Sequence, residues 1–117
     1  MKPVHWIGSS RKDLRAMPDQ VQDDIGYALY LAHMGGKHAD AKPLTGFKGA
    51  GVLEIVENHD GDTYRAVYTV RFANAIYVLH AFQKKSKRGI ATPQADMDLI
   101  KRRLLQAAED AKDNAND

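Results

Sequence analysis

The chain has 117 residues, 44% hydrophobic content and a formal net charge of +2, which together predict one small domain, residues 1–117, with an apolar core. It contains no cysteine, which excludes a disulfide framework and thiolate chemistry and fits a reducing, cytoplasmic environment. Its first residues, MKPVHWIGSSRKD, lack the apolar core of a signal peptide, and no stretch approaches the ~20 consecutive apolar residues of a membrane span. We therefore expect no membrane partner.

Charge is unevenly distributed along the chain. Residues 84–103 hold seven basic side chains and two acidic ones, whereas residues 109–117 hold four acids and one lysine. A basic segment of this kind suits binding to a polyanion, and we expect the acidic tail to be solvated or frayed.

The N-terminal part predicts a short strand followed by helices. His5, Trp6 and Ile7 after Val4 form the strand, and Ser10 with Asp13 resembles a capping box for a short helix over Lys12–Ala16. A longer helix begins at Pro18 and ends at the Gly35-Gly36 pair. One face of that helix is apolar: Val21, Ile25, Ala28, Leu29 and Ala32. Residues 37–51, which contain Pro43 and three glycines, are a predicted loop.

The segment from Val52 to Gln83 predicts three strands: Val52–Glu57, then Thr63–Phe72 and Ala75–Gln83, with a turn at 58–61. In the second strand two faces alternate. The predicted core face holds Tyr64, Ala66, Tyr68, Val70 and Phe72, and the predicted outer face holds Thr63, Arg65, Val67, Thr69 and Arg71.

A two-residue loop at Ala73-Asn74 would set the register of the last two strands. It would place Phe72 opposite Ala75, Tyr68 opposite Leu79, Ala66 opposite Ala81 and Arg65 opposite Phe82, with His80 on the diagonal to Arg65. The outer face would then gather Arg65, His80 and Phe82 next to Lys84. An error of one residue in this loop would move every side chain to the wrong face.

The last element is a helix that begins at Thr92-Pro93, with Thr92 as its cap and Pro93 in its first position. Its predicted apolar stripe is Met97, Ile100, Leu104, Leu105 and Ala108. The order of elements indicates an α+β fold with a small antiparallel sheet of about four strands, N-terminal helices packed on one face and a C-terminal helix. The short connections predict that the central strands are antiparallel.

Three segments carry a resemblance to a known family: GVLEIVENHDGDTYRAVYTV, AIYVLHAFQKKSKR and TPQADMDLIKRR. Their markers are Gly51, Leu53-Glu54-Ile55, Tyr64-Arg65, Tyr68, and Phe82 before Lys84-Lys85-Ser86. In this order and spacing they resemble the phage-derived Gp49-like, HigB-type branch of the RelE/ParE toxin superfamily. The resemblance implies the toxin of a type II toxin–antitoxin system. Members typically cut messenger RNA within the ribosome without a metal, whereas ParE relatives poison gyrase, so the fold alone does not decide the activity.

Metal-free RNA cleavage needs a base, an acid and cations that stabilise the phosphorane charge. Arg65 suits bidentate contact with phosphate, Lys84 and Lys85 suit phosphate contact or proton transfer, and His80 suits acid–base work. The residues predicted to bind RNA are Phe82 by stacking and Lys87, Arg88 and Arg71 by charge. No HExxH, CxxC or carboxylate pair has metal-ligand spacing, so we expect neither a metal nor another cofactor.

Each of these residues has a structural alternative. Arg65 could pair with Glu54 or Glu57 on a neighbouring strand, and the lysine run could protect a sheet edge from aggregation. His80 could be a half-buried structural residue, and His59 in its turn could be merely solvated. Lys101-Arg102-Arg103 is predicted to form the solvated side of the last helix, with RNA or antitoxin contact as the alternative.

The partners that the resemblance implies are the ribosome, messenger RNA and a cognate antitoxin of the HigA/Xre type with a helix-turn-helix. The chain shows no convincing helix-turn-helix of its own, so operator DNA would be bound only through the antitoxin. A second class of function stays open at this point: a non-catalytic module, either a gyrase poison or a phage nucleic-acid-binding protein.

Overall fold

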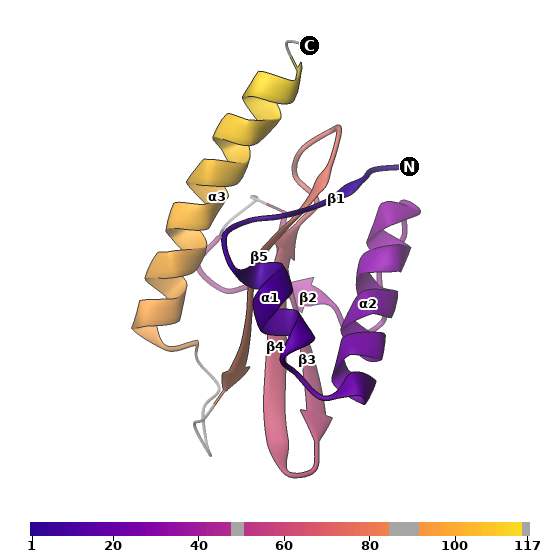
Figure 1. The fold of residues 1–117 in the computed structure, drawn as a ribbon. Coiled ribbons are helices and arrows are strands. Elements are labelled where there is room, and N and C mark those ends of the chain that lie inside the picture. Colours follow the sequence, from indigo (N-terminus) through magenta and orange to yellow (C-terminus); the bar gives the residue numbers. More distant parts are fainter. Residues whose placement is uncertain (48–50, 85–91, 116–117) are drawn as a thin grey trace.

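The structure is a computed structural model that describes residues 1–47, 51–84 and 92–115. Its centre is a five-stranded sheet in the order β1-β5-β4-β3-β2. Helices α1 and α2 cover one face of the sheet, and α3 covers the other (Figure 1). The elements are β1 (Val4–Trp6), α1 (Ser10–Arg15), α2 (Asp19–His33), β2 (Lys42–Pro43), β3 (Val52–His59), β4 (Asp62–Thr69), β5 (Ile76–Lys84) and α3 (Gln94–Ala115).

The α+β class is confirmed, but the strand count of about four is wrong. The two-residue strand β2 pairs with β3 inside the stretch predicted to be a loop. The central strands β3, β4 and β5 are antiparallel as predicted. Strand β1 pairs with β5 in parallel, so the sheet is mixed and not antiparallel throughout as predicted. A three-residue strand carries no sequence signal for its direction.

Both faces of β4 are buried, and this corrects the prediction of one solvent face. Tyr64, Ala66 and Tyr68 pack with α1 and α2, whereas Val67 packs with Ile100 and Ala107 of α3. Helix α3 also includes residues 109–115, which belong to the acidic tail predicted to be solvated or frayed. The alternating side chains of β4 therefore point into two different cores, one on each face of the sheet. The second core exists because α3 packs on the face that was expected to meet solvent.

The register between β4 and β5 is correct at one end and wrong at the other. Arg65 pairs with Phe82 and Ala66 with Ala81, as predicted, but Tyr68 pairs with Val78 instead of Leu79. The ladder is irregular between Val67 and Tyr68, and Leu79 is the additional residue on β5, which forms a β-bulge. The strands end at Thr69 and restart at Ile76, so the connection is longer than the predicted loop at Ala73-Asn74.

No helix among the described residues is both long enough and apolar enough to cross a membrane.

The C-terminal half of α3 is fixed to the sheet by a hydrogen bond that predicts a pH dependence. Tyr77 Oη donates to Asp110 Oδ2 at 2.6 Å. Burial, together with this bond and the charge of Asp110, raises the pKa of Tyr77 from 10.0 to about 12. The unfolded chain therefore loses the phenol proton first. The contribution of Tyr77 to stability is intact below pH 10 and is lost as the pH rises towards 12.

We expect the unfolding free energy, measured by urea titration, to fall over this pH range. The fall should be shallower in Tyr77→Phe, which has no phenol to ionise. Tyr27→Phe is the matched control, because Tyr27 is 55% exposed on α2. Equal slopes for Tyr77→Phe and the wild type would contradict this role of Tyr77.

Candidate active site

Four of the predicted site residues lie together at one end of the sheet, on the α3 side. Arg65 and Phe82 are directly paired, His80 stacks on Phe82 and Lys84 ends β5. The predicted residues Lys85, Lys87 and Arg88 lie outside the described residues. Arg71 follows the far end of β4, where it is exposed and its guanidinium lies 5.7 Å from the Phe72 ring. Arg71 lies six positions after Arg65, about 20 Å of extended chain, so Arg71 does not belong to this cluster.

Arg65 is buried, which corrects the expectation that it points out of the core. Its exposed fraction is 7%, and Nη1 donates to Glu54 Oε2 at 3.0 Å and to Thr92 Oγ1 at 3.2 Å. The pairing with Glu54, which the sequence left open as the structural alternative, is therefore present. Because Thr92 lies two residues before the first residue of α3, Arg65 connects the sheet to the segment that leads into that helix.

Lys84 is a buried cation close to this ion pair. Its exposed fraction is 5%, and burial lowers the pKa of its ammonium group. The positive charge of Arg65 lowers that pKa further, whereas Glu54 raises it. A lysine in this environment gives up its proton more readily than an exposed one, which is the property expected of a lysine that transfers protons.

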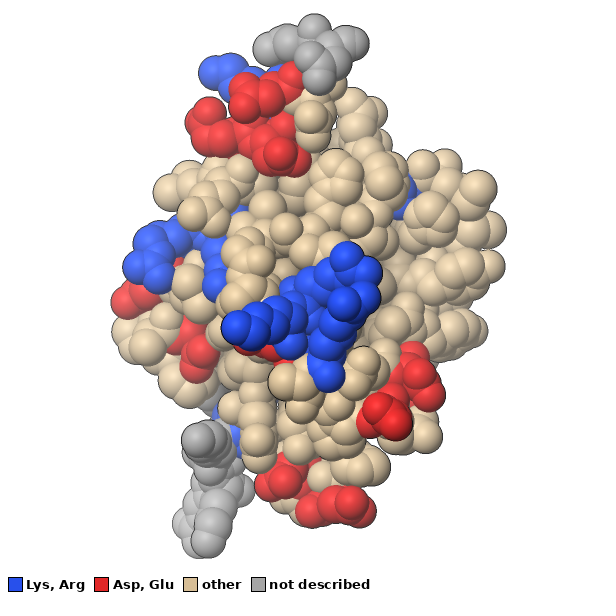
Figure 2. All heavy atoms as spheres, viewed as in Figure 1, with Lys and Arg blue, Asp and Glu red and all other residues tan. Residues whose placement is uncertain are grey.

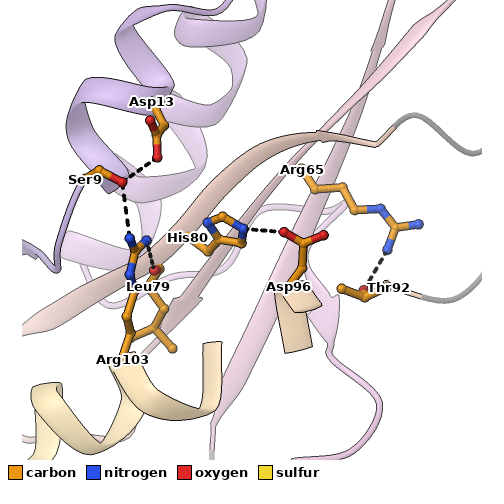
Figure 3. A network of polar contacts seen from close by, with 8 residues as sticks. All are labelled: Ser9, Asp13, Arg65, Leu79, His80, Thr92, Asp96 and Arg103. Carbon is orange, nitrogen blue, oxygen red and sulfur yellow. Dashed lines mark hydrogen bonds and ion pairs between the residues drawn. The ribbon is translucent and has the colours of Figure 1, made fainter. Parts of the chain in front are cut away.

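His80 is aimed by the β-bulge and held by the first turn of α3. Its Nε2 lies 2.7 Å from Asp96 Oδ1, and its ring stacks on Phe82 with centroids 4.4 Å apart and an interplanar angle of 15°. The other ring nitrogen, Nδ1, is buried and has no hydrogen-bond partner among the described residues. Figure 3 shows Asp96 between His80 and Arg65. Asp96 was not among the residues that the sequence singled out.

Arg103 is a further buried cation, although it was predicted to lie on the solvated side of the last helix. Its Nη1 donates to the bulge carbonyl of Leu79 at 2.9 Å, and its Nη2 donates to Ser9 Oγ at 3.1 Å (Figure 3). Ser9 Oγ in turn donates to Asp13 Oδ2 at 2.7 Å. Burial lowers the pKa of Arg103, and Asp13 opposes that shift. A sequence signal for this burial exists, because position 103 shares a helix face with Ile100 and Ala107.

Gly8 makes room for the Arg103 side chain. Its backbone has a positive φ of 57°, which glycine adopts without a steric cost. A Cβ at this position would lie 2.8–2.9 Å from atoms of the Arg103 guanidinium group. The turn before α1 and the buried guanidinium therefore require glycine for two separate reasons.

A basic surface that was not predicted from the sequence lies on α1. Arg11, Lys12 and Arg15 are exposed on this helix. Figure 2 shows a cluster of basic side chains at the place that α1 takes in Figure 1. Three basic residues within two turns of one helix make a compact positive surface on the face opposite α3.

Among the residues that the structure describes, no group of three or more His, Cys, Asp or Glu side chains is arranged to hold a metal ion.

Comparison with known proteins connects the chain to one family. Residues 12–105 match the family described as phage derived protein Gp49-like (DUF891). A comparison with curated proteins finds no match. The matched region begins in α1 and ends in α3, so it contains the whole cluster around Arg65, His80 and Lys84. The chain therefore belongs to the phage-derived Gp49-like family, which is associated with the RelE-type toxin superfamily.

Proposed function

We propose that this protein is the toxin of a type II toxin–antitoxin system, a ribosome-dependent and metal-independent endoribonuclease that cuts messenger RNA and so inhibits translation. The observation that carries the proposal is the grouping of Arg65, His80 and Lys84 around Phe82 at one end of the sheet. Family membership supports the same reading through the association with RelE-type toxins.

The proposed reaction is an attack by a ribose 2′-hydroxyl on the adjacent phosphorus. His80 takes the hydroxyl proton as the new bond to phosphorus forms. The bond from phosphorus to the 5′ oxygen breaks, and that oxygen receives a proton from the Lys84 ammonium group. The products are a 2′,3′-cyclic phosphate and a 5′-hydroxyl. Arg65 stabilises the negative charge that develops on the phosphorane.

Burial strengthens the stabilisation of an anion by Arg65 and Lys84, but it also engages Arg65 in bonds within the protein. Charges act over a lower dielectric constant here than in water, so Arg65 and Lys84 stabilise an anion more strongly. The Arg65 guanidinium is, however, already bonded to Glu54 and Thr92. We therefore propose that the ribosome positions the message, which explains why isolated RNA should be a poor substrate.

The proposed RNA contacts extend beyond the cluster. Phe82 offers an aromatic surface at the site, and Lys85, Lys87 and Arg88 follow β5 in the sequence. Lys85 is also a candidate for proton transfer. The exposed basic surface of α1 gives a second contact for the phosphate backbone of RNA, which would weaken as salt rises.

The proposed partners are the ribosome with its message and a cognate antitoxin with a helix-turn-helix, and operator DNA is bound only through that antitoxin. An active toxin needs such an inhibitor. We expect co-expression of the adjacent gene product to give a complex and to restore growth.

The decisive experiment is induction in cells with mapping of new 5′ ends in messenger RNA. The wild type should create new 5′ ends within translated regions. His80→Gln should reduce their number by ~10²-fold or more, because it removes a proton-transfer group. The matched control is His59→Gln, since His59 ends β3 at the β3–β4 turn, where it pairs with Asp62 and not with β5. Purified protein should cut ribosome-free RNA poorly.

One observation favours the second candidate function, a non-catalytic binding module such as a gyrase poison. The buried Arg65–Glu54 pair gives Arg65 a structural role that requires no reaction. Continued translation with a rise in DNA-damage signals after induction would select this alternative and overturn the endoribonuclease.

A further inference from the structure

We propose that Asp96 is a positioning residue that holds His80 in the tautomer with its proton on Nε2, so that Nδ1 is the atom that accepts a proton. The catalytic consequence rests on the proposed RNA cleavage, whereas the tautomer is a property of the folded protein and is measured without any substrate.

The first observation is the short contact between the two side chains. Asp96 is the third residue of α3, and its Oδ1 lies 2.7 Å from His80 Nε2. A carboxylate accepts hydrogen bonds and does not donate them, so the proton of the pair belongs to Nε2. The distance is typical of a charge-assisted hydrogen bond. The exposed fractions of the His80 and Asp96 side chains are 8% and 28%, so water competes little for Nε2.

The second observation is the unpartnered nitrogen on the other side of the ring. Nδ1 of His80 is buried and receives no hydrogen bond from the described part of the chain. Buried polar atoms without partners are rare in folded proteins, and each needs an explanation, of which a catalytic role is one. With Nε2 occupied by Asp96, the lone pair on Nδ1 is the remaining basic position of the ring.

Three further contacts fix the direction of the ring. The β-bulge sets Leu79 and His80 opposite Val67, and Arg103 holds the Leu79 carbonyl at 2.9 Å. Phe82 stacks on the imidazole from one side. Sheet, bulge and stacking determine where the ring lies, but they do not distinguish its two nitrogens. Among the residues that the structure describes, the contact with Asp96 is the one that decides which nitrogen carries the proton.

The test compares two substitutions on the same helix. Asp96→Asn removes the carboxylate that accepts from Nε2, and an amide can also donate to that nitrogen. Asp98→Asn makes the same change in charge two residues away, where Asp98 is exposed and accepts a hydrogen bond from Gln94. Nitrogen-15 NMR of the imidazole rings, recorded at about pH 8 to favour neutral rings, reports the tautomer. The His80 signal is assigned by its loss in His80→Gln.

We expect the Nε2–H tautomer in the wild type and in Asp98→Asn, and a shift towards Nδ1–H in Asp96→Asn. Single-turnover cleavage on programmed ribosomes should slow by ~10²-fold or more in Asp96→Asn, with ribosome binding unchanged. Asp96→Glu, which keeps a carboxylate, should recover part of both effects. Thermal melting of every variant shows whether it is folded.

The outcomes separate this inference from the proposed function. A wild type with the Nδ1–H tautomer, or a folded Asp96→Asn with an unchanged tautomer, overturns the role of Asp96. If Asp96→Asn shifts the tautomer but cuts at the wild-type rate, Nδ1 is not the base, and the inference fails while the endoribonuclease stands. If the wild type does not cut at all, the proposed function fails, and the tautomer shift alone upholds the positioning of His80.

Discussion

Replacing Arg65 with alanine should lower the unfolding free energy by about 3–5 kcal/mol, because it leaves a buried carboxylate without its partner. Glu54 is 7% exposed, and its Oε2 accepts from Arg65 at 3.0 Å. The substitution also breaks the connection to Thr92 in the segment that leads into α3. Thermal melting should show a loss of roughly 10–20 °C for a domain of this size.

Two companion variants make this result interpretable. Arg71→Ala removes an exposed arginine from the same segment and should change stability by no more than about 0.5 kcal/mol. The double variant Arg65→Met with Glu54→Leu replaces both charges by apolar groups and should recover most of the lost stability. If Arg65→Ala melts like the wild type, the ion pair contributes nothing, and Arg65 is available for a purely catalytic role.

The same result decides how catalysis by Arg65 can be tested. If Arg65→Ala lost activity, the assay would not distinguish unfolding from loss of a phosphate contact. Arg65→Lys keeps a positive charge next to Glu54 but lacks the planar fork that binds phosphate in a bidentate manner. Cleavage assays on this variant, with its melting temperature measured alongside, separate the two effects.

Replacing Arg103 with alanine should cost about 2–4 kcal/mol. The change leaves the buried Leu79 carbonyl without its donor, and a buried polar group left unpaired costs ~1–3 kcal/mol. It also removes the donor to the hydroxyl of Ser9, which is exposed. It also removes the guanidinium group that packs next to Gly8. Urea denaturation should give a lower midpoint with an unchanged slope.

Arg102→Ala is the matched control, because Arg102 is exposed one position earlier on the same helix. Arg103→Met retains the volume without the donors, so it should fall between Arg103→Ala and the wild type. Equal stability of Arg103→Ala and Arg102→Ala would mean that the bulge carbonyl needs no donor from α3.

Much of the local structure could be predicted from the sequence. The two-residue loop assumed at Ala73-Asn74 predicted the correct pairing of Arg65 with Phe82, although the connection is longer, because the bulge at Leu79 shifts the register by one residue. The β-bulge at Leu79 was not predicted. The side chains of residues 76–79 alternate between the two cores without interruption. The extra residue is therefore identified only from the pairing with β4.

The polar side chains at the site were harder to predict than the elements that carry them. Arg65 and Arg103 are both buried, because α3 covers a face that the β4 pattern alone assigns to solvent. Propensity and periodicity describe one element at a time, whereas the burial of a charge depends on what packs over it. Position 103 illustrates the difference, since its place beside Ile100 on the apolar stripe outweighs its charge.

The hydrogen bond between Arg103 and Ser9 has a consequence for folding during synthesis. The two residues are 94 positions apart, and the strand with which β1 pairs is β5, late in the chain. Contacts between distant residues form late, after the entropy of closing a long loop has been overcome. During synthesis, β1 therefore cannot pair until β5 has been made. The β-bulge next to His80 forms its contact with Arg103 only when α3 has left the ribosome. A growing chain thus carries an incomplete site until its last helix is released.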